Sequence, residues 1–340
     1  MAQLPKISIV VSTYNGRRWL PETLQSLLNQ SYPAEKMEIV VIDDGSTDSS
    51  AELAKSILEK GQVSYLVKST SNQRINRANN VGWKAASGDW VLFLGHDDLL
   101  APEKLQLSFN SGVFYGPETA AVYSDWQRYS FISGRWDRSG RVIRAELPNL
   151  APYPMIRGLF KGIYIHGSAI FFCRSRLDKI GGFDELINSA EDANIQIRID
   201  MAGGVFRYVP SAFPLSFWRN TPGSWSKVGR YELAVGVIHN MKIIEGLMRE
   251  KNLLNQEGID WLASQYFSLG RNLSLGDWNE FLELANHLNK LKPNYIPPRA
   301  SIAFIPYVIY RLMGYKALFV IGVTYRWLRG WIMNLMMRRA

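Results

Sequence analysis

Three pairs of acidic residues in this sequence have the spacing and the chemistry of a ligand-binding site. Residues 40–46 (VVIDDGS) and 90–100 (WVLFLGHDDLL) are apolar runs that end in adjacent acids, and Glu191 and Asp192 open a predicted helix. An apolar run that ends in two carboxylates cannot bury them, so it must direct them at a solvent-filled crevice. In open α/β sheets, ligands bind in that crevice, beyond the carboxyl ends of the strands. Because clustered acids repel one another, the sequence predicts a divalent metal and an anionic, phosphorylated ligand.

The residues after the second apolar run are the expected metal site. Mg²⁺ and Mn²⁺ prefer hard oxygen ligands and often take only one or two from the protein, with phosphate and water supplying the rest. We expect Asp98 to bind the metal, with Asp97 beside it and turned towards the sugar moieties of the ligand. His96 could be a direct or indirect ligand, although a single histidine in a loop more often has neither role.

The other polar groups each have a structural and a functional interpretation. Asp43 and Asp44 could form a turn, or they could accept hydrogen bonds from a nucleotide base or from ribose hydroxyls. Acids at the start of a helix, such as Glu191 and Asp192, are favoured by the macrodipole whatever the function. Functionally, one of these two would be a general base, which contributes roughly 10²–10⁴-fold in rate. Arg219, in residues 218–226 (WRNTPGSWS), suits a diphosphate, or the segment is simply an exposed loop.

Short apolar segments alternate with amphipathic segments through the first hundred residues, and these elements would position the acids. The apolar segments predict strands at 7–12, 37–42, 63–67 and 90–94. Helices are predicted between them, at about 21–30, 49–60 and 77–86. Such alternation implies parallel pairing with right-handed crossovers. We therefore predict an α/β fold with a doubly wound, mostly parallel sheet and flanking helices.

The pattern is less regular beyond Leu100. It predicts strands at 120–123, 167–173 and 205–209, a polar hairpin or loop at 126–144, and a helix at 190–202. From about Tyr231 to Leu291 the sequence reads as helical, which predicts a C-terminal helical extension. We divide the chain into a catalytic domain at 1–228, a helical extension at 229–295 and a tail at 296–340.

The net charge of +9 in 340 residues is concentrated in the tail. No acidic residue follows Glu283, whereas nine basic residues do, so the preceding part of the chain is electrically balanced. Because the chain up to Glu283 carries no net charge and contains no nucleic-acid recognition motif, the sequence argues against nucleic-acid binding. The single cysteine, Cys173, cannot form an internal disulfide and fits a reducing compartment. The N-terminus reads as a first strand, not as a secretory signal.

The tail mixes aromatic and aliphatic residues with basic ones. Arg311, Lys316, Arg326 and Arg329 interrupt it, so it contains no uncharged stretch of the ~18 residues that a membrane span needs. Basic and aromatic residues on apolar helices fit an interfacial membrane anchor, which predicts a cytoplasmic protein peripheral to the inner face of the cell membrane. The alternative is a helix pair that forms a homo-oligomer or packs on the domain.

Five motifs in order make the chain resemble the family 2 inverting glycosyltransferases with the GT-A fold, over about residues 6–226. The motifs are VSTYNG (11–16), VIDDGSTD (41–48), NNVGW…ASGDWVLFLGHDD (79–98), IGGFDE (180–185) and EDANIQIR (191–198). The resemblance implies transfer of one sugar from a nucleotide-diphospho-sugar, commonly a uridine derivative, to a hydroxyl of a glycan or lipid-linked acceptor. It implies Asp98 as ligand of Mn²⁺ or Mg²⁺, and Asp192, beside Glu191, as catalytic base in a single displacement.

The resemblance and the residue chemistry together give a candidate nucleotide site. Its members are polar or aromatic, and all but Asn80, which falls in the predicted helix at 77–86, follow the predicted strands or lie in loops: Thr13, Tyr14, Asn15, Asp43, Asp44, Asn80, Asp97 and Arg219.

The chain also departs from the family pattern. Gly95 stands where many relatives carry Asp, Arg74 where they often have Gly, and Asn79 where they often have Arg. The Gln-x-x-Arg-Trp signature of processive synthases is absent, which favours transfer of one sugar at a time. Two other functions stay open: a catalytically silent sugar-nucleotide-binding or scaffold protein, and a nucleotidyltransferase, for which STYNGRRW is a poor phosphate loop.

Overall fold

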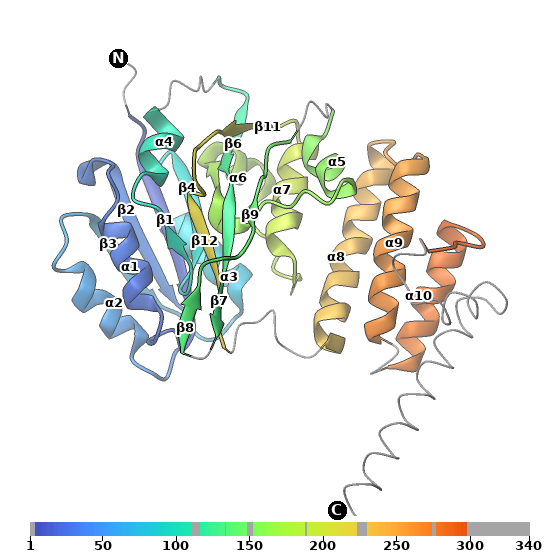
Figure 1. The fold of residues 1–340 in the computed structure, drawn as a ribbon, viewed down its shortest axis with the longest axis horizontal. Helices are drawn as coiled ribbons and strands as arrows, with labels where there is room; N and C mark the ends of the chain where they lie inside the picture. The colour runs from blue at the N-terminus through green and yellow to red at the C-terminus, as the bar shows by residue number, and fades with distance from the viewer. Residues whose placement is uncertain are drawn as a thin grey trace, which may run out of the picture. The chain divides into compact units, whose positions relative to one another are not determined.

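The computed structural model describes residues 4–110, 116–132, 134–147, 152–187, 189–222, 230–273 and 277–297. The chain divides into two compact units, Met1–Ser224 and Trp225–Ala340. The first contains sheets with flanking helices, and the second is helical in its described part (Figure 1).

A seven-stranded sheet forms the centre of the first unit, in the order β11-β6-β10-β4-β1-β2-β3. β1 pairs in parallel with β2 on one side and with β4 on the other, whereas β10 runs antiparallel to both β4 and β6. The sheet is therefore mostly parallel, as predicted. Its strands are β1 (Ile7–Thr13), β2 (Met37–Asp43), β3 (Ser64–Ser69), β4 (Trp90–Gly95), β6 (Thr119–Ser124), β10 (Ile170–Cys173) and β11 (Val205–Val209).

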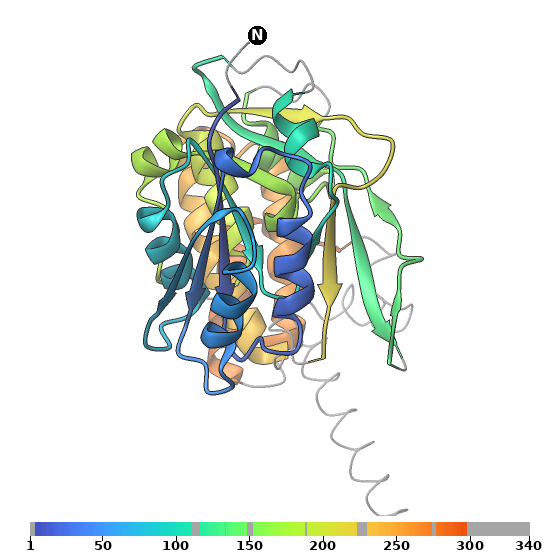
Figure 2. The same ribbon diagram turned by 90° about the vertical axis from the view of Figure 1, so that its left-hand side faces the viewer.

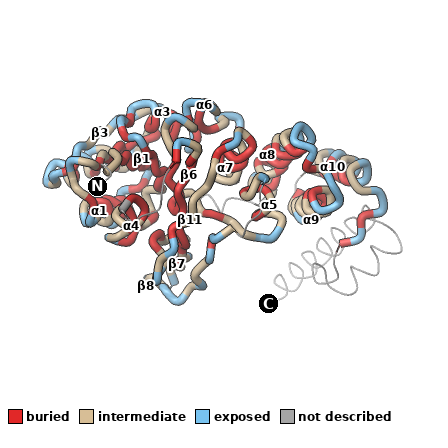
Figure 3. Tube along the Cα trace, turned by 90° about the horizontal axis from the view of Figure 1, so that it is seen from above, coloured by how far each residue is buried: buried red, intermediate tan, exposed pale blue. Residues whose placement is uncertain are grey.

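Helices cover both faces of this sheet (Figure 2). Alternate residues of β1 enter different cores, because successive side chains of a strand point to opposite faces. Ile9 and Val11 belong to a cluster with α1 and α2, whereas Val10 belongs to a cluster with α3, α6 and α7. Figure 3 shows the buried residues, in red, along the central strands. The helices are α1 (Leu20–Leu28), α2 (Ser50–Leu58), α3 (Ile75–Ala85), α4 (Lys104–Asn110), α5 (Pro154–Phe160), α6 (Arg174–Ile180) and α7 (Glu191–Met201), with short 3₁₀ turns η1 (Ala34–Lys36) and η2 (Gly167–Ala169).

A second, smaller sheet confirms one of the sequence expectations and corrects another. Its path is β5-β12-β7-β8, with β9 paired to β7. The segment 126–144, expected as a polar hairpin or loop, contains a hairpin, because β7 (Trp126–Ile132) pairs antiparallel with β8 (Arg135–Asp137), and it also contributes β9 (Val142–Ile143). The loop expected from 218 is wrong at its start, because β12 (Ser216–Asn220) pairs with β7 and with β5 (Leu99–Leu100). Residues 223–226 of that expected loop lie outside the described residues.

One buried carboxylate joins the two ends of the segment 126–144. Asp125, between β6 and β7, is fully buried. Its Oδ1 accepts a hydrogen bond from the backbone N–H of Ala145 at 2.9 Å, and its Oδ2 pairs with Arg144. The chain therefore leaves the main sheet after β6 and comes back to the same place, beside Asp125, at the end of this segment.

The second unit contains α8 (Arg230–Glu250), α9 (Gln256–Leu273) and α10 (Trp278–Leu291), as the helical pattern predicts. Asp277 caps α10 by accepting hydrogen bonds from the backbone N–H groups of Asn279 and Glu280. None of the described helices is long and apolar enough to cross a bilayer. The predicted tail, 296–340, lies outside the described residues from 298 onwards.

Two helical glycines should respond in opposite directions to substitution by alanine. A Cβ on Gly82 of α3 would overlap the Val10 side chain of β1, whereas a Cβ on Gly246 of α8 meets no atom within 4 Å. Overpacking costs about 1–3 kcal/mol, so Gly82→Ala should lower the free energy of unfolding. Gly246→Ala should raise it by about 0.5–1 kcal/mol through helix propensity. Chemical denaturation measures both, and equal changes in the two variants would contradict the close packing of α3 on β1.

Candidate active site

Several of the predicted nucleotide-binding residues lie where three parallel strands end. Thr13, at the end of β1, is the register partner of Asp43 at the end of β2, and Ser12 is the partner of Gly95 at the end of β4. Parallel pairing therefore brings the segments that follow these strands to a single edge of the sheet.

Two buried polar atoms at this edge have no hydrogen-bond partner among the described residues. They are Oγ1 of Thr13 and Oδ1 of Asp43. Leaving a buried polar atom unpaired costs about 1–3 kcal/mol, so such atoms in a folded protein call for an explanation. A hydroxyl and a carboxylate oxygen side by side can receive a ligand that both donates and accepts hydrogen bonds. The neighbouring Tyr14 is 47% exposed.

Asp44 and Asn15 hold the surrounding loops in place. The Asp44 carboxylate accepts hydrogen bonds from the Gln73 backbone N–H at 2.9 Å and from the Thr70 hydroxyl at 3.0 Å. Asn15 Oδ1 accepts a hydrogen bond from the backbone N–H of Thr47 at 2.9 Å. These contacts fix the loops after β1, β2 and β3 relative to one another.

The structure gives Asn80 a different role from the predicted one. Its side chain is buried, and Nδ2 donates to the carbonyl of Phe183 and to Glu185 Oε1, both at 3.0 Å. Its Oδ1 accepts hydrogen bonds from the Phe183 N–H at 2.9 Å and from Trp83 Nε1 at 3.0 Å. With both its donors and its acceptor engaged by protein, Asn80 joins α3 to the 181–185 turn and is not available to a nucleotide.

The predicted metal ligand, Asp98, is buried among other acids. Its Oδ1 accepts a hydrogen bond from the backbone N–H of Arg219 at 3.0 Å. Burial raises its pKa well above the ordinary value, and the charges of Asp97 and Asp192 raise it further. Asp97 accepts a hydrogen bond from the Thr221 hydroxyl at 2.7 Å. A cation at this place would relieve the repulsion between these carboxylates.

Asp192, at the start of α7, reaches the same acid cluster and is held in a fixed orientation. Its Oδ2 accepts hydrogen bonds from the Tyr164 hydroxyl and from the backbone N–H of Gly167, the latter at 3.0 Å. Burial and the neighbouring Asp192 raise the pKa of Glu191 to about 7. A carboxylate so oriented can accept a proton from a hydroxyl placed beside it.

Sequence reasoning missed two residues of this cluster, Tyr164 and His166. His166 Nδ1 lies 3.9 Å from Asp98 Oδ2, and burial lowers the pKa of its imidazole. Both residues precede β10, which runs antiparallel to β4, so the start of β10 lies at the edge where β4 ends. Polar residues just before an antiparallel strand thus lie at the same edge of the sheet as polar residues just after a parallel strand. Tyr164 and His166, which precede an apolar strand, could have been found from the sequence by this rule.

A buried lysine supports the segment that contacts Asp192. Lys104 of α4 donates hydrogen bonds from Nζ to the Ser124 hydroxyl at 2.7 Å and to the carbonyl of Ala169 at 2.8 Å. Burial lowers its pKa to about 7. Ser216 of β12 donates to the neighbouring carbonyl of Ser168 at 2.9 Å. The η2 turn is therefore held by both sheets.

Arg219 also departs from its predicted role as a diphosphate ligand. Its side chain is buried within β12, not exposed in a loop. The guanidinium donates to Glu22, to the carbonyl oxygens of Asp97 and Trp19, and to the Thr23 hydroxyl. Since protein atoms occupy these donors, the arginine fixes the Asp97–Asp98 segment against α1.

The donor set at this edge fits a hard divalent cation that takes few ligands from protein. Over the described parts of the chain, no group of three or more His, Cys, Asp or Glu side chains is arranged to hold a metal ion. Asp98 and Asp97 offer the carboxylate oxygens that Mg²⁺ and Mn²⁺ prefer, and a phosphorylated ligand would complete the coordination.

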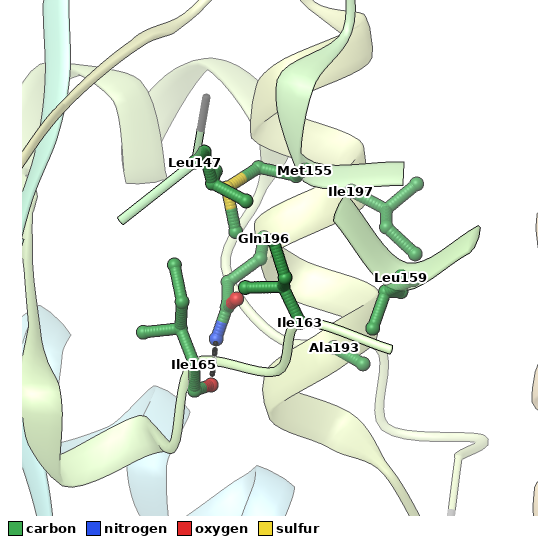
Figure 4. Close-up of a pocket in the computed structure, with 8 residues that line it drawn as sticks. All are labelled: Leu147, Met155, Leu159, Ile163, Ile165, Ala193, Gln196 and Ile197. Carbon is green, nitrogen blue, oxygen red and sulfur yellow. Dashed lines mark hydrogen bonds between the residues drawn. The ribbon is translucent and has the colours of Figure 1, made fainter. Parts of the chain in front are cut away.

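A small pocket beside this cluster is apolar. Leucine, isoleucine, methionine and alanine side chains line it, from α5, from α7, from the segment after α5 and from Leu147 before α5. Gln196 Nε2 donates to the carbonyl of Ile165 at 2.9 Å (Figure 4). The only polar side chain in its lining is therefore engaged by the backbone, and the pocket has the character of core packing beneath α7. Its lining residues are Leu147, Met155, Leu159, Ile163, Ile165, Ala193, Gln196 and Ile197.

Sequence comparison matches residues 8–180 to the family described as Glycosyl transferase family 2. An uncharacterized glycosyltransferase of Haemophilus influenzae is 39% identical over 107 residues, which are 32% of this chain and 42% of that protein. The probable glycosyltransferase YdaM of Bacillus subtilis is 26% identical over 233 residues, 66% of this chain and 53% of that protein. The chain thus spans about half, or less, of the length of these curated relatives.

Solved structures share the fold. Residues 1–349 of S. aureus TarS in complex with UDP-GlcNAc match with a TM-score of 0.62 and 19% identity, over 94% of this chain and 91% of that one. A mannosyltransferase from Pyrobaculum calidifontis in complex with GDP-Man and Mn²⁺ matches with a TM-score of 0.55 and 19% identity, over 96% and 88% of the two chains. The expected GT-A architecture is confirmed.

The buried contacts of Arg219 predict a large effect on stability. Arg219→Met leaves several buried acceptors unpaired and should cost about 2–3 kcal/mol of unfolding free energy. Glu22→Gln is the matched control and should cost less, because the Glu22 side chain is 55% exposed and the amide oxygen of the variant can still accept a hydrogen bond from the guanidinium. Denaturant titration of both variants measures the difference. An equal loss in the two would mean that the ion pair, not the burial of the guanidinium, is what matters.

Proposed function

Because the chain belongs to glycosyl transferase family 2, we propose that it transfers one sugar from a uridine-diphosphate sugar to a hydroxyl group, with inversion at the anomeric carbon. The observation that carries this proposal is the convergence of Asp98 and Asp192 from distant parts of the chain. Asp98 Oδ2 lies 3.9 Å from His166 Nδ1, and the backbone N–H of the next residue, Gly167, donates to Asp192 Oδ2 at 3.0 Å.

In the proposed reaction, the acceptor hydroxyl attacks the anomeric carbon from the face opposite the diphosphate. A new carbon–oxygen bond forms while the bond to the diphosphate breaks, and the hydroxyl proton passes to the carboxylate of Asp192. The Tyr164 hydroxyl and the Gly167 N–H keep that carboxylate oriented. No covalent intermediate with the protein is required, because a single displacement inverts the configuration.

The donor would lie at the edge formed by β1, β2 and β4. The unpaired oxygens of Thr13 and Asp43 are suited to the base, and the exposed ring of Tyr14 can stack on it. Asp98, with Asp97 beside it, would hold Mn²⁺ or Mg²⁺. When bound, such an ion neutralises the charge of the departing diphosphate. The solved TarS complex with UDP-GlcNAc supports a uridine donor.

Asp192→Asn tests the base directly. The variant keeps an oxygen that can accept from Gly167 but cannot take up the proton, so turnover should fall by about 10²–10⁴-fold. Binding of UDP with Mn²⁺, measured by calorimetry, should stay unchanged. Glu191→Gln is the neighbouring control and should lose less activity. Near-normal turnover in Asp192→Asn would exclude Asp192 as the base, and UDP binding without transfer by the parent protein would favour a silent binding protein.

We further propose that the acceptor is a glycan or lipid-linked saccharide and that the basic tail, 296–340, binds an anionic membrane surface on the cytoplasmic side. The proposal rests on the sequence, where nine basic and no acidic residues follow Glu283. Each basic residue near an anionic leaflet contributes about 1 kcal/mol before screening.

Removal of residues 299–340 should abolish co-sedimentation with vesicles that contain anionic lipid. Vesicles of neutral lipid are the control, and they should bind the full chain less tightly because they lack the electrostatic attraction to its basic residues. Equal binding of the full and shortened chains to anionic vesicles would contradict a membrane-binding tail. A change from dimer to monomer on truncation, read by light scattering, would instead favour the oligomer-forming alternative.

A further inference from the structure

One face of the second sheet carries aromatic and basic side chains next to the acid cluster. Trp126 and Arg128 are two residues apart on β7, so their side chains lie on the same face of the strand. Trp218 of β12 is the register partner of Arg128 and therefore shares that face.

These side chains form a continuous strip that begins at the catalytic carboxylates. His166, beside Asp98, has its ring centroid 5.4 Å from that of Trp126 and 5.5 Å from that of Trp218. The guanidinium carbon of Arg128 lies 4.8 Å from the Trp218 ring centroid. The order along the strip is therefore Asp98, His166, Trp218, Arg128.

Core packing accounts for one end of this strip but not for the other. Trp126 is buried, and its Nε1 donates to the carbonyl of Tyr164 at 3.1 Å. Arg128 is exposed, and none of the ion pairs found among the described residues involves it. A guanidinium stacked on an aromatic ring keeps its N–H donors at the rim, where they can bind a phosphate in a bidentate manner.

The surrounding segment reinforces this preference for an anion. Between Trp126 and Leu147 the chain carries five arginines and two acids. Arg144 is paired with Asp125. The local excess of positive charge attracts anionic molecules to this side of the site. The residues concerned are Arg128, Arg135, Arg138, Arg141 and Arg144 against Asp137 and Glu146.

We propose that this strip is the acceptor site and that the acceptor carries a phosphate group. The inference rests on the proposed transferase function and names its substrate class. The hydroxyl to be glycosylated lies at Asp192, the polyhydroxylated part of the acceptor packs on Trp218, and the phosphate binds Arg128. The phosphate is not consumed: the only bonds that change are those at the anomeric carbon and the acceptor hydroxyl.

Binding of small probes to the full chain tests the proposal. The protein is first saturated with UDP and Mn²⁺, so that the donor site is filled, and is then titrated with glucose 6-phosphate, glucose and inorganic phosphate by ligand-observed NMR. Glucose 6-phosphate should bind at least ~10-fold more tightly than either other probe, because only it can engage both Trp218 and Arg128.

Arg128→Ala should weaken glucose 6-phosphate binding by at least ~10-fold, since it removes a charge-assisted bidentate contact. Arg138→Ala is the matched control. Arg138 lies over the Tyr129 ring at 5.6 Å, and Tyr129 follows Arg128 on β7, so this arginine is on the opposite face of the strand. It should leave the affinity unchanged. Thermal unfolding checks that both variants are folded.

Any of three results would overturn the proposal, apart from the phosphate result considered next: no binding of glucose 6-phosphate, equal binding of glucose, or equal affinity in Arg128→Ala and the parent protein. Inorganic phosphate binding as tightly as the sugar phosphate would mean an adventitious anion only, and would also overturn it. Failure of UDP to bind in the first step is a separate outcome, because it would count against the proposed transferase function itself.

Discussion

The burial of Asp98 among other acids is the constraint to which the rest of the active site responds. A carboxylate in this position is costly, as its raised pKa indicates. The protein compensates with Arg219, whose backbone N–H contacts Asp98 and whose guanidinium contacts the carbonyl of Asp97. Because Asp98 follows β4 and Arg219 belongs to β12, this contact also fixes the small sheet to the large one at the place where the chemistry is proposed.

The same principle applies to the donor side. The unpaired oxygens of Thr13 and Asp43 reduce the stability of the protein when no ligand is bound. Functional sites often carry such local costs, because groups that must satisfy a ligand cannot first satisfy each other. The surrounding loops are well bonded, through Asp44 and Asn15 in particular, so the two oxygens are held at fixed positions.

Much of the fold could be predicted from the sequence because the first four strands are short, apolar and separated by amphipathic helices. The acids after β2 and β4 were identified for the same reason: their environment is set by the strand directly before them. The pairing of β7 with β12 in a second sheet could not be predicted in this way. Arg219 and Asn80 looked like solvent-exposed binding groups, yet their partners, such as Glu22 and Phe183, are remote in the sequence. A buried polar residue can be recognised only when the partner that satisfies it is known.

Asp125 has an evolutionary consequence. It binds Ala145 and Arg144 where the chain departs from β6 and where it comes back. A segment closed at its base in this manner can change in length and composition while β1, β2, β4 and α7 keep their places. Under the proposal that β7 contributes to the acceptor site, changes within this segment alter the choice of acceptor and leave the strands proposed to hold the donor untouched.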